Sequence, residues 1–265
     1  MTSVELSSPA YGAVSESFRI THLSVELTNQ CSKGCSFCYN SSSAAGQTLW
    51  TNDSLLAFFA DCASNGLEAV SLGGGEPLEY PGLLDLLDGI PHALGRSLTT
   101  NGLALDADPS LLVKLLAAPL DKAHVSIHFP ERRAEVERAI RLVKAFEEGG
   151  IAGGVNLLVR HGKTADARDA YQALTSHGIG PEQIVLLPMK GSTGPTPSEL
   201  GAVAGSANLQ SMSCLLGCAT SPRFASVDWD GRVAWCSYTD SRIALSEPTY
   251  RAMHQAMQSL DLRTC

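Results

Sequence analysis

The chain has 265 residues, of which 44% are hydrophobic and 17% are charged, and its formal net charge is −8. This length suits one core domain with a small extension, and the composition is that of a globular protein that buries a large core. The acidic balance argues against the nucleic-acid backbone as a partner, because proteins that bind it usually carry a basic face.

The sequence pattern contains no targeting signal. No basic N-terminal stretch precedes an apolar run, so we expect no signal peptide. The apolar run over residues 111–120 is interrupted by Lys114 and Pro119, and we expect no membrane span. Eight cysteines in a chain without an export signal fit metal ligation in a reducing cytoplasm.

Apolar runs alternate with amphipathic segments between residues 20 and 190, after an N-terminal arm, residues 1–19, that is rich in Ser, Ala and Gly. The pattern predicts strands that alternate with helices. The expected strands are residues 23–27, 67–72, 96–99, 123–127, 154–159 and 183–187. The expected helices begin after Thr51, at Pro81 and after Asp108, and two more cover residues 132–148 and 164–177.

Six successive β/α units predict an α/β fold in which helices cover the outside of a parallel sheet. A closed barrel of eight units needs about 250 residues. Residues 20–190 are too few for that, so we expect a partial (β/α)6 barrel. The functional side chains should then lie at the carboxyl ends of the strands.

Three cysteines, Cys31, Cys35 and Cys38, follow the first expected strand at CxxxCxxC spacing. Thiolates are the usual ligands of iron–sulfur clusters, and three of them leave one iron of a [4Fe–4S] cube open to a substrate or cofactor. A zinc loop is one alternative, although structural zinc sites usually have four ligands arranged in CxxC pairs. The cysteines could also form disulfides or remain free thiols, but disulfides are unexpected in a chain without a secretion signal.

The loop CSKGCSFC, with Phe37 before the last cysteine, resembles the CxxxCxΦC signature of the radical S-adenosylmethionine (radical SAM) enzymes, in which Φ is aromatic. Residues 71–78, SLGGGEPL, resemble that family's GGEP motif after the second strand. The resemblance covers about residues 20–190. It implies that S-adenosylmethionine chelates the open iron through its amino and carboxylate groups. The same resemblance implies a cofactor-binding set of Phe37, Gly73, Gly74, Gly75 and Glu76, although Glu76 could instead cap the following helix.

Four polar residues lie at or just after the ends of later expected strands. Asn101 belongs to an Asn-Gly pair, so it is either a plain turn residue or a functional one. Ser126 and His128 alternate along a strand and so point to one face, where the family has Ser and an acid that contact the cofactor. His128 replaces that acid and either touches cofactor or substrate or is a core residue with partners. Asn156 resembles a ribose contact.

A linker rich in Gly, Pro, Ser and Thr is expected at residues 191–205, before an extension over residues 206–265. Asp-Gly between two apolar runs, residues 224–236, predicts a β-hairpin, and residues 248–260 are expected to be a surface helix. The segment resembles the twitch or shortened SPASM extension of radical SAM enzymes, which binds one auxiliary [4Fe–4S] cluster. The resemblance suggests as its ligands Cys214, Cys218, Cys236 and Cys265.

Cys265 could instead be a thiol that donates a hydrogen atom to the substrate radical, or part of a frayed tail. A zinc hairpin is the alternative for the whole extension. Cys62 lies within an expected helix and is interpreted as a buried apolar residue.

The resemblance implies an enzyme that cleaves S-adenosylmethionine reductively and abstracts hydrogen from a substrate. The first expected substrate is a peptide, which the enzyme would crosslink, epimerise or oxidise. The second is a small natural product such as an aminocyclitol. No N-terminal domain of the size that captures leader peptides is evident, so a peptide is expected to need a separate capture protein or direct recognition. The expected electron donor is a flavodoxin or ferredoxin. A non-catalytic zinc or iron–sulfur module is the alternative of another class.

Overall fold

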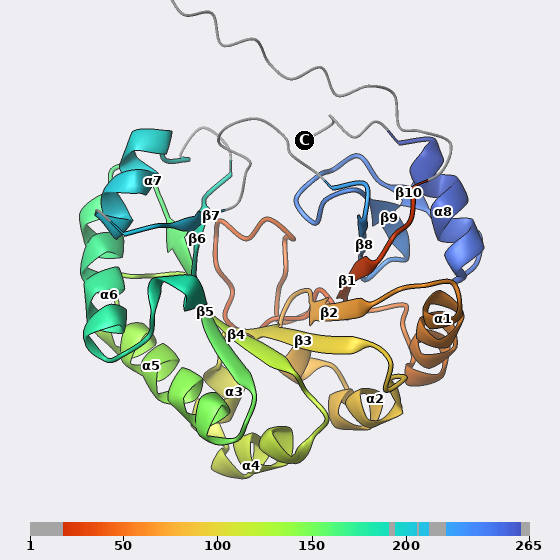
Figure 1. The fold of residues 1–265 in the computed structure, drawn as a ribbon, viewed down its shortest axis with the longest axis horizontal. Coiled ribbons are helices and arrows are strands. Elements are labelled where there is room, and N and C mark those ends of the chain that lie inside the picture. Colours follow the sequence, from red (N-terminus) through yellow and green to blue (C-terminus); the bar gives the residue numbers. More distant parts are fainter. Residues whose placement is uncertain (1–17, 191–193, 206, 212–220, 261–265) are drawn as a thin grey trace, which may run out of the picture.

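The computed structural model describes residues 18–190, 194–205, 207–211 and 221–260. Its strands form one ten-stranded sheet in the order β10-β9-β8-β1-β2-β3-β4-β5-β6-β7 (Figure 1). The six expected strands are present and pair in parallel with their neighbours in the chain. They are β1 (His22–Glu26), β2 (Ala69–Gly73), β3 (Gly95–Thr100), β4 (Lys122–Ile127), β5 (Ala152–Val159) and β6 (Ile184–Pro188). The predicted α/β fold with a parallel sheet is confirmed.

Helices cover the outer side of the curved sheet (Figure 1). They are α1 (Asn52–Ser64), α2 (Leu83–Gly89), α3 (Leu103–Ala107), α4 (Pro109–Ala117), α5 (Arg133–Glu148) and α6 (Thr164–Ser176). Thr51 caps α1 and forms a capping box with Ser54, as its position before the apolar run predicts. None of the helices in the described residues is long and apolar enough to cross a membrane.

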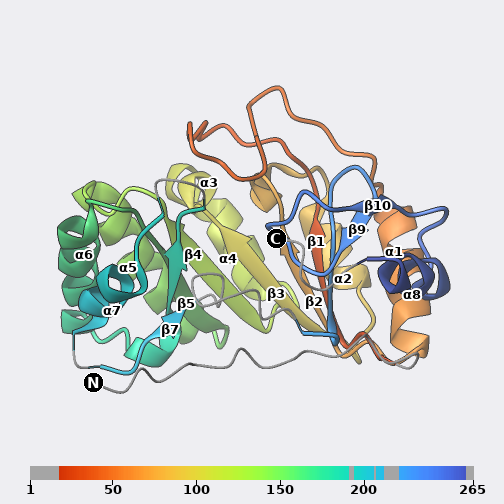
Figure 2. The same cartoon turned by 90° about the horizontal axis from the view of Figure 1, so that it is seen from above.

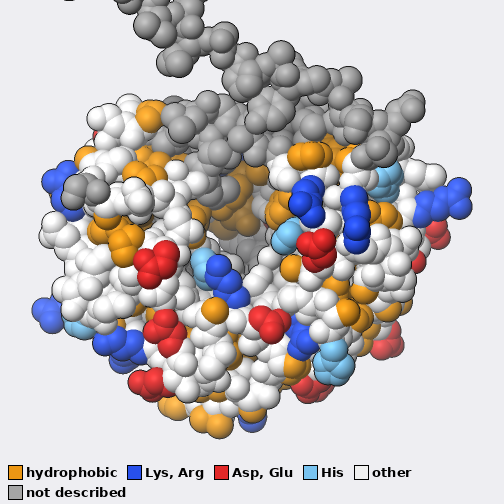
Figure 3. All heavy atoms as spheres, in the orientation of Figure 1, with side chains coloured by type: hydrophobic (Ala, Val, Ile, Leu, Met, Phe, Trp, Pro, Cys, Tyr) orange, Lys and Arg blue, Asp and Glu red, His pale blue; other side chains and the backbone are white. Residues whose placement is uncertain are grey.

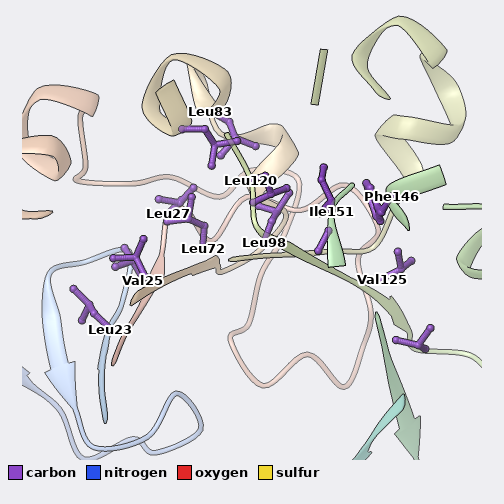
Figure 4. Packing of buried hydrophobic residues seen from close by; sticks show 14 of the residues in the cluster. Leu23, Val25, Leu27, Leu72, Leu83, Leu98, Leu120, Val125, Phe146 and Ile151 are labelled. Carbon is purple, nitrogen blue, oxygen red and sulfur yellow. The ribbon is translucent and has the colours of Figure 1, made fainter. Parts of the chain in front are cut away.

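The hydrophobic core lies between the sheet and these helices. Leu27, Leu72 and Leu98 project from consecutive strands towards the side on which Leu83 of α2 lies (Figure 4). Successive side chains of a strand point to opposite faces, so the alternate residues must face the inside of the curve. These include serines in register on β1, β2 and β3, and the hydroxyl of Ser97 donates to that of Ser71 at 2.7 Å. The inner face is therefore polar over β1, β2 and β3, whereas on β5 and β6 it also carries Leu158, Val185 and Leu187.

Residues 191–205, expected to be a linker, contain the helix α7 (Pro197–Ala204). Thr196 accepts a hydrogen bond from the Glu199 N–H, and Pro197 occupies the first turn, where its missing N–H costs nothing. A short strand, β7 (Gln210–Ser211), then adds to β6 in parallel. The Gly, Pro, Ser and Thr content predicted a loop, but Thr196, Pro197 and Glu199 form a helix start signal within it.

The C-terminal segment continues the barrel sheet. The predicted hairpin is present as β8 (Phe224–Val227) and β9 (Arg232–Ala234), which pair antiparallel. β8 also pairs in parallel with β1, which attaches the hairpin to the first strand of the barrel. The short strand β10 (Ile243–Ala244) pairs with β9, and α8 (Tyr250–Gln258) lies within the helix expected at residues 248–260.

Candidate functional site

The loop that carries the three cysteines leaves the carboxyl end of β1 and stands out from the sheet (Figure 2). Backbone hydrogen bonds fix its base: the Cys31 N–H donates to the Ser43 carbonyl at 2.8 Å, and the Ser43 N–H donates to the Asn29 carbonyl at 3.1 Å. The Glu76 N–H also donates to the Gln30 carbonyl at the base of the loop, at 2.8 Å. The cysteine loop is thus joined to the segment that follows β2.

Cys31, Cys35 and Cys38 are half-buried free thiols. Within the described residues, no three Cys, His, Asp or Glu side chains converge on a single ion-binding point. A zinc ion needs such convergence, because all of its ligands share one atom. The ligands of a [4Fe–4S] cube bind different iron atoms, so its three thiols need not meet at one point. Partial burial raises the pKa of the Cys31 and Cys35 thiols, whose protons must leave when metal binds.

The glycines after β2 allow two loops to approach each other closely. The Gly75 N–H donates to the Thr28 carbonyl at 2.6 Å, and a Cβ on Gly75 would overlap the backbone of Gln30. Gly74 has φ +117°, and a Cβ there would lie 2.5 Å from the Thr28 carbonyl oxygen. A Cβ on Gly73 would meet no atom within 4 Å, so this glycine borders open space.

Glu76 is buried and both of its carboxylate oxygens have protein partners. Oε1 accepts from the Thr100 hydroxyl at 2.7 Å and from the Leu78 N–H at 3.1 Å, and Oε2 accepts from the Asn101 N–H at 2.8 Å. Burial raises the pKa of this carboxyl to about 7 against the effect of these hydrogen bonds. Glu76 thus caps the short 3-10 helix η1 (Pro77–Glu79), the alternative that the sequence left open. Its contact with a cofactor stays a prediction.

Asn101 is buried beside the cysteine loop, and its side-chain amide lies 3.8 Å from the sulfur of Cys31. Its side-chain oxygen accepts from the Leu103 N–H at 2.9 Å, which is the turn geometry expected of Asn-Gly. Asn101 therefore shapes the turn, as one of the two alternatives predicted, and its functional role stays a prediction.

A buried ion pair that the sequence did not predict ties the cysteine loop to α5. Lys33, between the first two cysteines, places its Nζ 2.5 Å from Oε1 of Glu135 and 2.9 Å from Nδ1 of His128. Burial, with the charge of Lys33, lowers the pKa of His128 to about 4. The imidazole is therefore neutral near pH 7 and accepts the hydrogen bond from Lys33. The sequence does show an acid, Glu135, in the first turn of the helix after the fourth strand. No pattern near Lys33 indicates that the two residues would pair.

The remaining predicted residues of the barrel lie on β4, β5 and the cysteine loop. Ser126 pairs in register with Asn156, and Asn156 Oδ1 is 2.9 Å from Nδ1 of His124, so the structure groups these polar side chains on neighbouring strands. Phe37 is half-buried, and its ring centroid lies 5.2 Å from that of Phe129. The ring of Phe129 therefore packs against the cysteine loop, to which Phe37 belongs.

Cys236 is half-buried just after β9, and the Tyr238 N–H donates to its sulfur at 3.4 Å. Cys214, Cys218 and Cys265 lie outside the described residues. Cys62 is fully buried within α1, in agreement with its interpretation as an apolar residue.

A family model of the radical SAM superfamily matches residues 25–192 of the chain. The GTP 3′,8-cyclase of Clostridium perfringens (strain 13 / Type A) is 36% identical over 92 residues, which are 32% of this chain and 28% of that relative. A probable GTP 3′,8-cyclase of Saccharolobus islandicus (strain M.16.4 / Kamchatka #3) is 31% identical over 139 residues, 52% of this chain and 42% of that relative. The match thus spans less than half the length of either relative.

Two solved structures share the fold. SuiB of Streptococcus suis bound to S-adenosylmethionine aligns with a TM-score of 0.66 at 14% identity, over 86% of this chain and 63% of SuiB. Native anSMEcpe with bound AdoMet aligns with a TM-score of 0.63 at 13% identity, over 89% of this chain and 83% of that one. Identities this low establish similarity of fold alone.

Proposed function

Because the chain belongs to the radical SAM superfamily, we propose that it cleaves S-adenosylmethionine reductively and removes a hydrogen atom from a polar organic substrate. One observation carries this proposal: a loop with three thiols lies hydrogen-bonded against a glycine motif at the carboxyl ends of β1 and β2. When bound, the [4Fe–4S] cluster and S-adenosylmethionine supply the electron and the 5′-deoxyadenosyl radical that the protein itself cannot supply.

The chain's own residues bind, orient and shield these groups. Cys31, Cys35 and Cys38 would hold three irons, and the Asn101 amide would donate to the Cys31 sulfur as it does in the structure. The open space at Gly73 supports a place there for the methionine end of the cofactor. Of the three polar residues Ser126, His128 and Asn156, we assign contact with cofactor or substrate to two. His128 would position Lys33, whereas Ser126 and Asn156 would contact cofactor or substrate from the inner face.

We further propose an auxiliary [4Fe–4S] cluster on the extension, with Cys236 as one ligand and Cys214, Cys218 and Cys265 as the others. The support is that Cys236 is a half-buried free thiol on a hairpin whose first strand pairs with β1. Such a cluster would sit on the same sheet as the cysteine loop. Electrons would come from a flavodoxin or ferredoxin.

For the substrate, the polar inner side of β1, β2 and β3 favours a small hydrophilic molecule. Hydroxyls of Ser24, Ser71 and Ser97 stand in register, and Figure 3 shows a hollow at the centre of this side of the molecule. A peptide is the second candidate, supported by the fold shared with SuiB, which has been solved bound to the precursor peptide SuiA. The names of the curated relatives suggest GTP, but the formal charge of −8 does not favour a triphosphate.

The test is anaerobic reconstitution with iron and sulfide, reduction with dithionite, and measurement of 5′-deoxyadenosine and methionine. We expect both products in equal amounts, and none from a Cys35→Ala variant. Cys62→Ala is the matched control, because that cysteine is buried in α1 away from the loop, and it should keep the wild-type yield. A colourless protein that binds zinc and releases neither product would refute the proposal.

A further inference from the structure

The side chain of Asn101 reaches the cysteine loop from another strand of the barrel. Asn101 follows β3, whereas Cys31 follows β1, and β2 lies between these two strands (Figure 1). The side-chain nitrogen of Asn101 nevertheless donates to the Cys31 sulfur at 3.8 Å. Asn101 is only 4% exposed, so water competes little for this donor. The contact therefore joins a buried donor to one cysteine of the three-thiol motif.

Hydrogen bonds on both sides of Asn101 fix the direction of its amide. The side-chain oxygen accepts from the Leu103 N–H at 2.9 Å, and the backbone N–H donates to Glu76 Oε2 at 2.8 Å. The other oxygen of Glu76 accepts from the Thr100 hydroxyl at 2.7 Å, which holds this carboxylate in place. A flipped amide would set its own N–H groups against the Leu103 N–H and leave that donor unpaired. The nitrogen therefore faces the sulfur, and the oxygen faces the turn.

The backbone that carries this amide is packed tightly against α5. Gly102 has φ +74°, and its N–H donates to the Thr100 hydroxyl at 2.9 Å. A Cβ on Gly102 would lie 2.6 Å from Cδ1 of Leu142, a residue of α5. Only glycine combines this φ with so close an approach. The position of the donor is thus set by the barrel and does not depend on the cysteine loop alone.

Two carboxylates lie close to Cys31. Glu76 lies behind the asparagine, and Glu79 accepts both the backbone N–H, at 2.9 Å, and the hydroxyl, at 2.7 Å, of Ser32, the next residue of the loop. The nearby Lys33 ammonium is already matched by its buried ion pair. Negative charges beside an iron–sulfur cluster oppose its reduction, because reduction adds one more negative charge. A donor aimed at a ligand sulfur has the opposite effect, since it stabilises the added charge.

We propose that Asn101 tunes the cluster of the cysteine loop: by donating to the Cys31 sulfur, it favours the reduced form and raises the reduction potential. Asn101 acts through Cys31, so it is a positioning residue and not a catalytic one. Hydrogen bonds to ligand sulfurs are one of the means by which proteins set the potential of iron–sulfur clusters. The inference rests on the proposed function, because it requires a [4Fe–4S] cluster on these cysteines. If Asn101 shaped only the turn, a variant that keeps the turn would keep the potential.

The test is a redox titration of the anaerobically reconstituted protein, followed by electron paramagnetic resonance. The signal that changes when S-adenosylmethionine is added identifies the cluster of the cysteine loop. Asn101→Asp keeps the acceptor for the Leu103 N–H but replaces the donor by a charged oxygen. Asn101→Ser keeps a shorter acceptor near the turn, and its hydroxyl is too short to reach the sulfur.

We expect Asn101→Ser to lower the equilibrium constant for reduction about three- to tenfold, and tenfold corresponds to about 59 mV for one electron. Asn101→Asp should lower it further, because it also places a negative charge beside the sulfur. The control is Asn65→Asp, which adds the same charge at the exposed C-terminal end of α1. This variant should keep the wild-type potential.

Circular dichroism and iron content establish that each variant folds and holds its cluster. A wild-type potential in either folded Asn101 variant would overturn the proposal, and so would an equal shift in Asn65→Asp. Loss of the cluster from both Asn101 variants would also overturn it, because a tuning donor is not needed for assembly. A protein that cleaves S-adenosylmethionine while these potentials stay equal overturns only the role of Asn101. A wild-type protein that forms no iron–sulfur cluster overturns the proposed function as well.

Discussion

Lys33 and Glu135 are separated by 102 positions in the chain, yet their charged groups meet at 2.5 Å with side chains only 6% and 4% exposed. Glu135 also accepts the His128 N–H at 2.6 Å, so one carboxylate joins the cysteine loop, the end of β4 and the first turn of α5. A buried charge without its partner is strongly unfavourable. This pair therefore fixes where the cysteine loop stands over the sheet.

Replacement of Glu135 by Ala should release the loop. The variant leaves the Lys33 ammonium buried and unpaired, which costs about 3–5 kcal/mol. We expect a lower free energy of unfolding and a lower iron content after reconstitution, measured by denaturation and by iron assay. The reduced protein should also show a changed electron paramagnetic resonance signal, which a purely structural role elsewhere would not produce.

Glu137→Ala is the matched control on the same helix, because its carboxylate is 49% exposed and pairs with Arg133 at the surface. It should change neither iron content nor spectrum. The double variant Lys33→Met/Glu135→Ala removes both charges and should recover much of the lost stability. Wild-type iron content and spectrum in Glu135→Ala would show that the pair does not position the loop.

Gly73 and Gly75 allow a matched comparison in the glycine motif. A methyl group on Gly75 would overlap the backbone of Gln30, so Gly75→Ala should lower the free energy of unfolding by about 1–3 kcal/mol or more. Gly73→Ala meets no atom within 4 Å and should leave stability unchanged. If Gly73 borders the cofactor, the same variant should still bind S-adenosylmethionine more weakly, as measured by equilibrium dialysis. Unchanged affinity would remove Gly73 from the cofactor site.

The sequence predicted the six barrel strands because each is a short apolar run ended by polar or turn residues, as in Leu67–Leu72 before the glycines. It did not predict that β8 would pair with β1, since the two strands are separated by about 200 residues and no local pattern names a strand's partner. For His128 the sequence left open either contact with cofactor or substrate or a core position with protein partners. Its actual partner, Lys33, is 95 residues away and is set by tertiary packing.

The pH dependence of stability should report Glu26. Burial raises the pKa of this carboxyl from 4.5 to about 7, with Arg242 opposing the shift. The folded state then holds the proton more tightly than the unfolded state, so this group costs stability as the pH rises from about 4.5 through about 7. Glu26→Gln cannot ionise. Its stability relative to wild type should increase by about 1–3 kcal/mol between about pH 5 and about pH 8.

The measurement is chemical denaturation of both proteins at several pH values. Glu137→Gln serves as the control, because an exposed acid should show no such trend. A constant difference between Glu26→Gln and wild type across this range would mean that the Glu26 carboxyl titrates normally in the folded protein.

The extension should account for half of the iron. Two four-iron clusters give about eight irons per chain, and a Cys214→Ala/Cys218→Ala/Cys236→Ala variant should keep about four. Cys62→Ala is the control, because it removes one thiol that is buried in α1. This variant should keep about eight irons. Unchanged iron in the triple variant would show that the C-terminal cysteines are not ligands.

Cys265 has two candidate roles in the extension. A cluster ligand must be a thiolate held near iron, whereas a hydrogen-atom donor must be a protonated thiol near the substrate. Trp235 Nε1 donates to the Leu260 carbonyl at 3.1 Å, which brings the chain back to the hairpin only five residues before Cys265. If Cys265 is a ligand, Cys265→Ala should lose iron and alter the spectrum of the auxiliary cluster. If it is a donor, the variant should keep both clusters but stop turnover after hydrogen abstraction, which is measured as 5′-deoxyadenosine without product. Normal iron, spectra and product would exclude both roles.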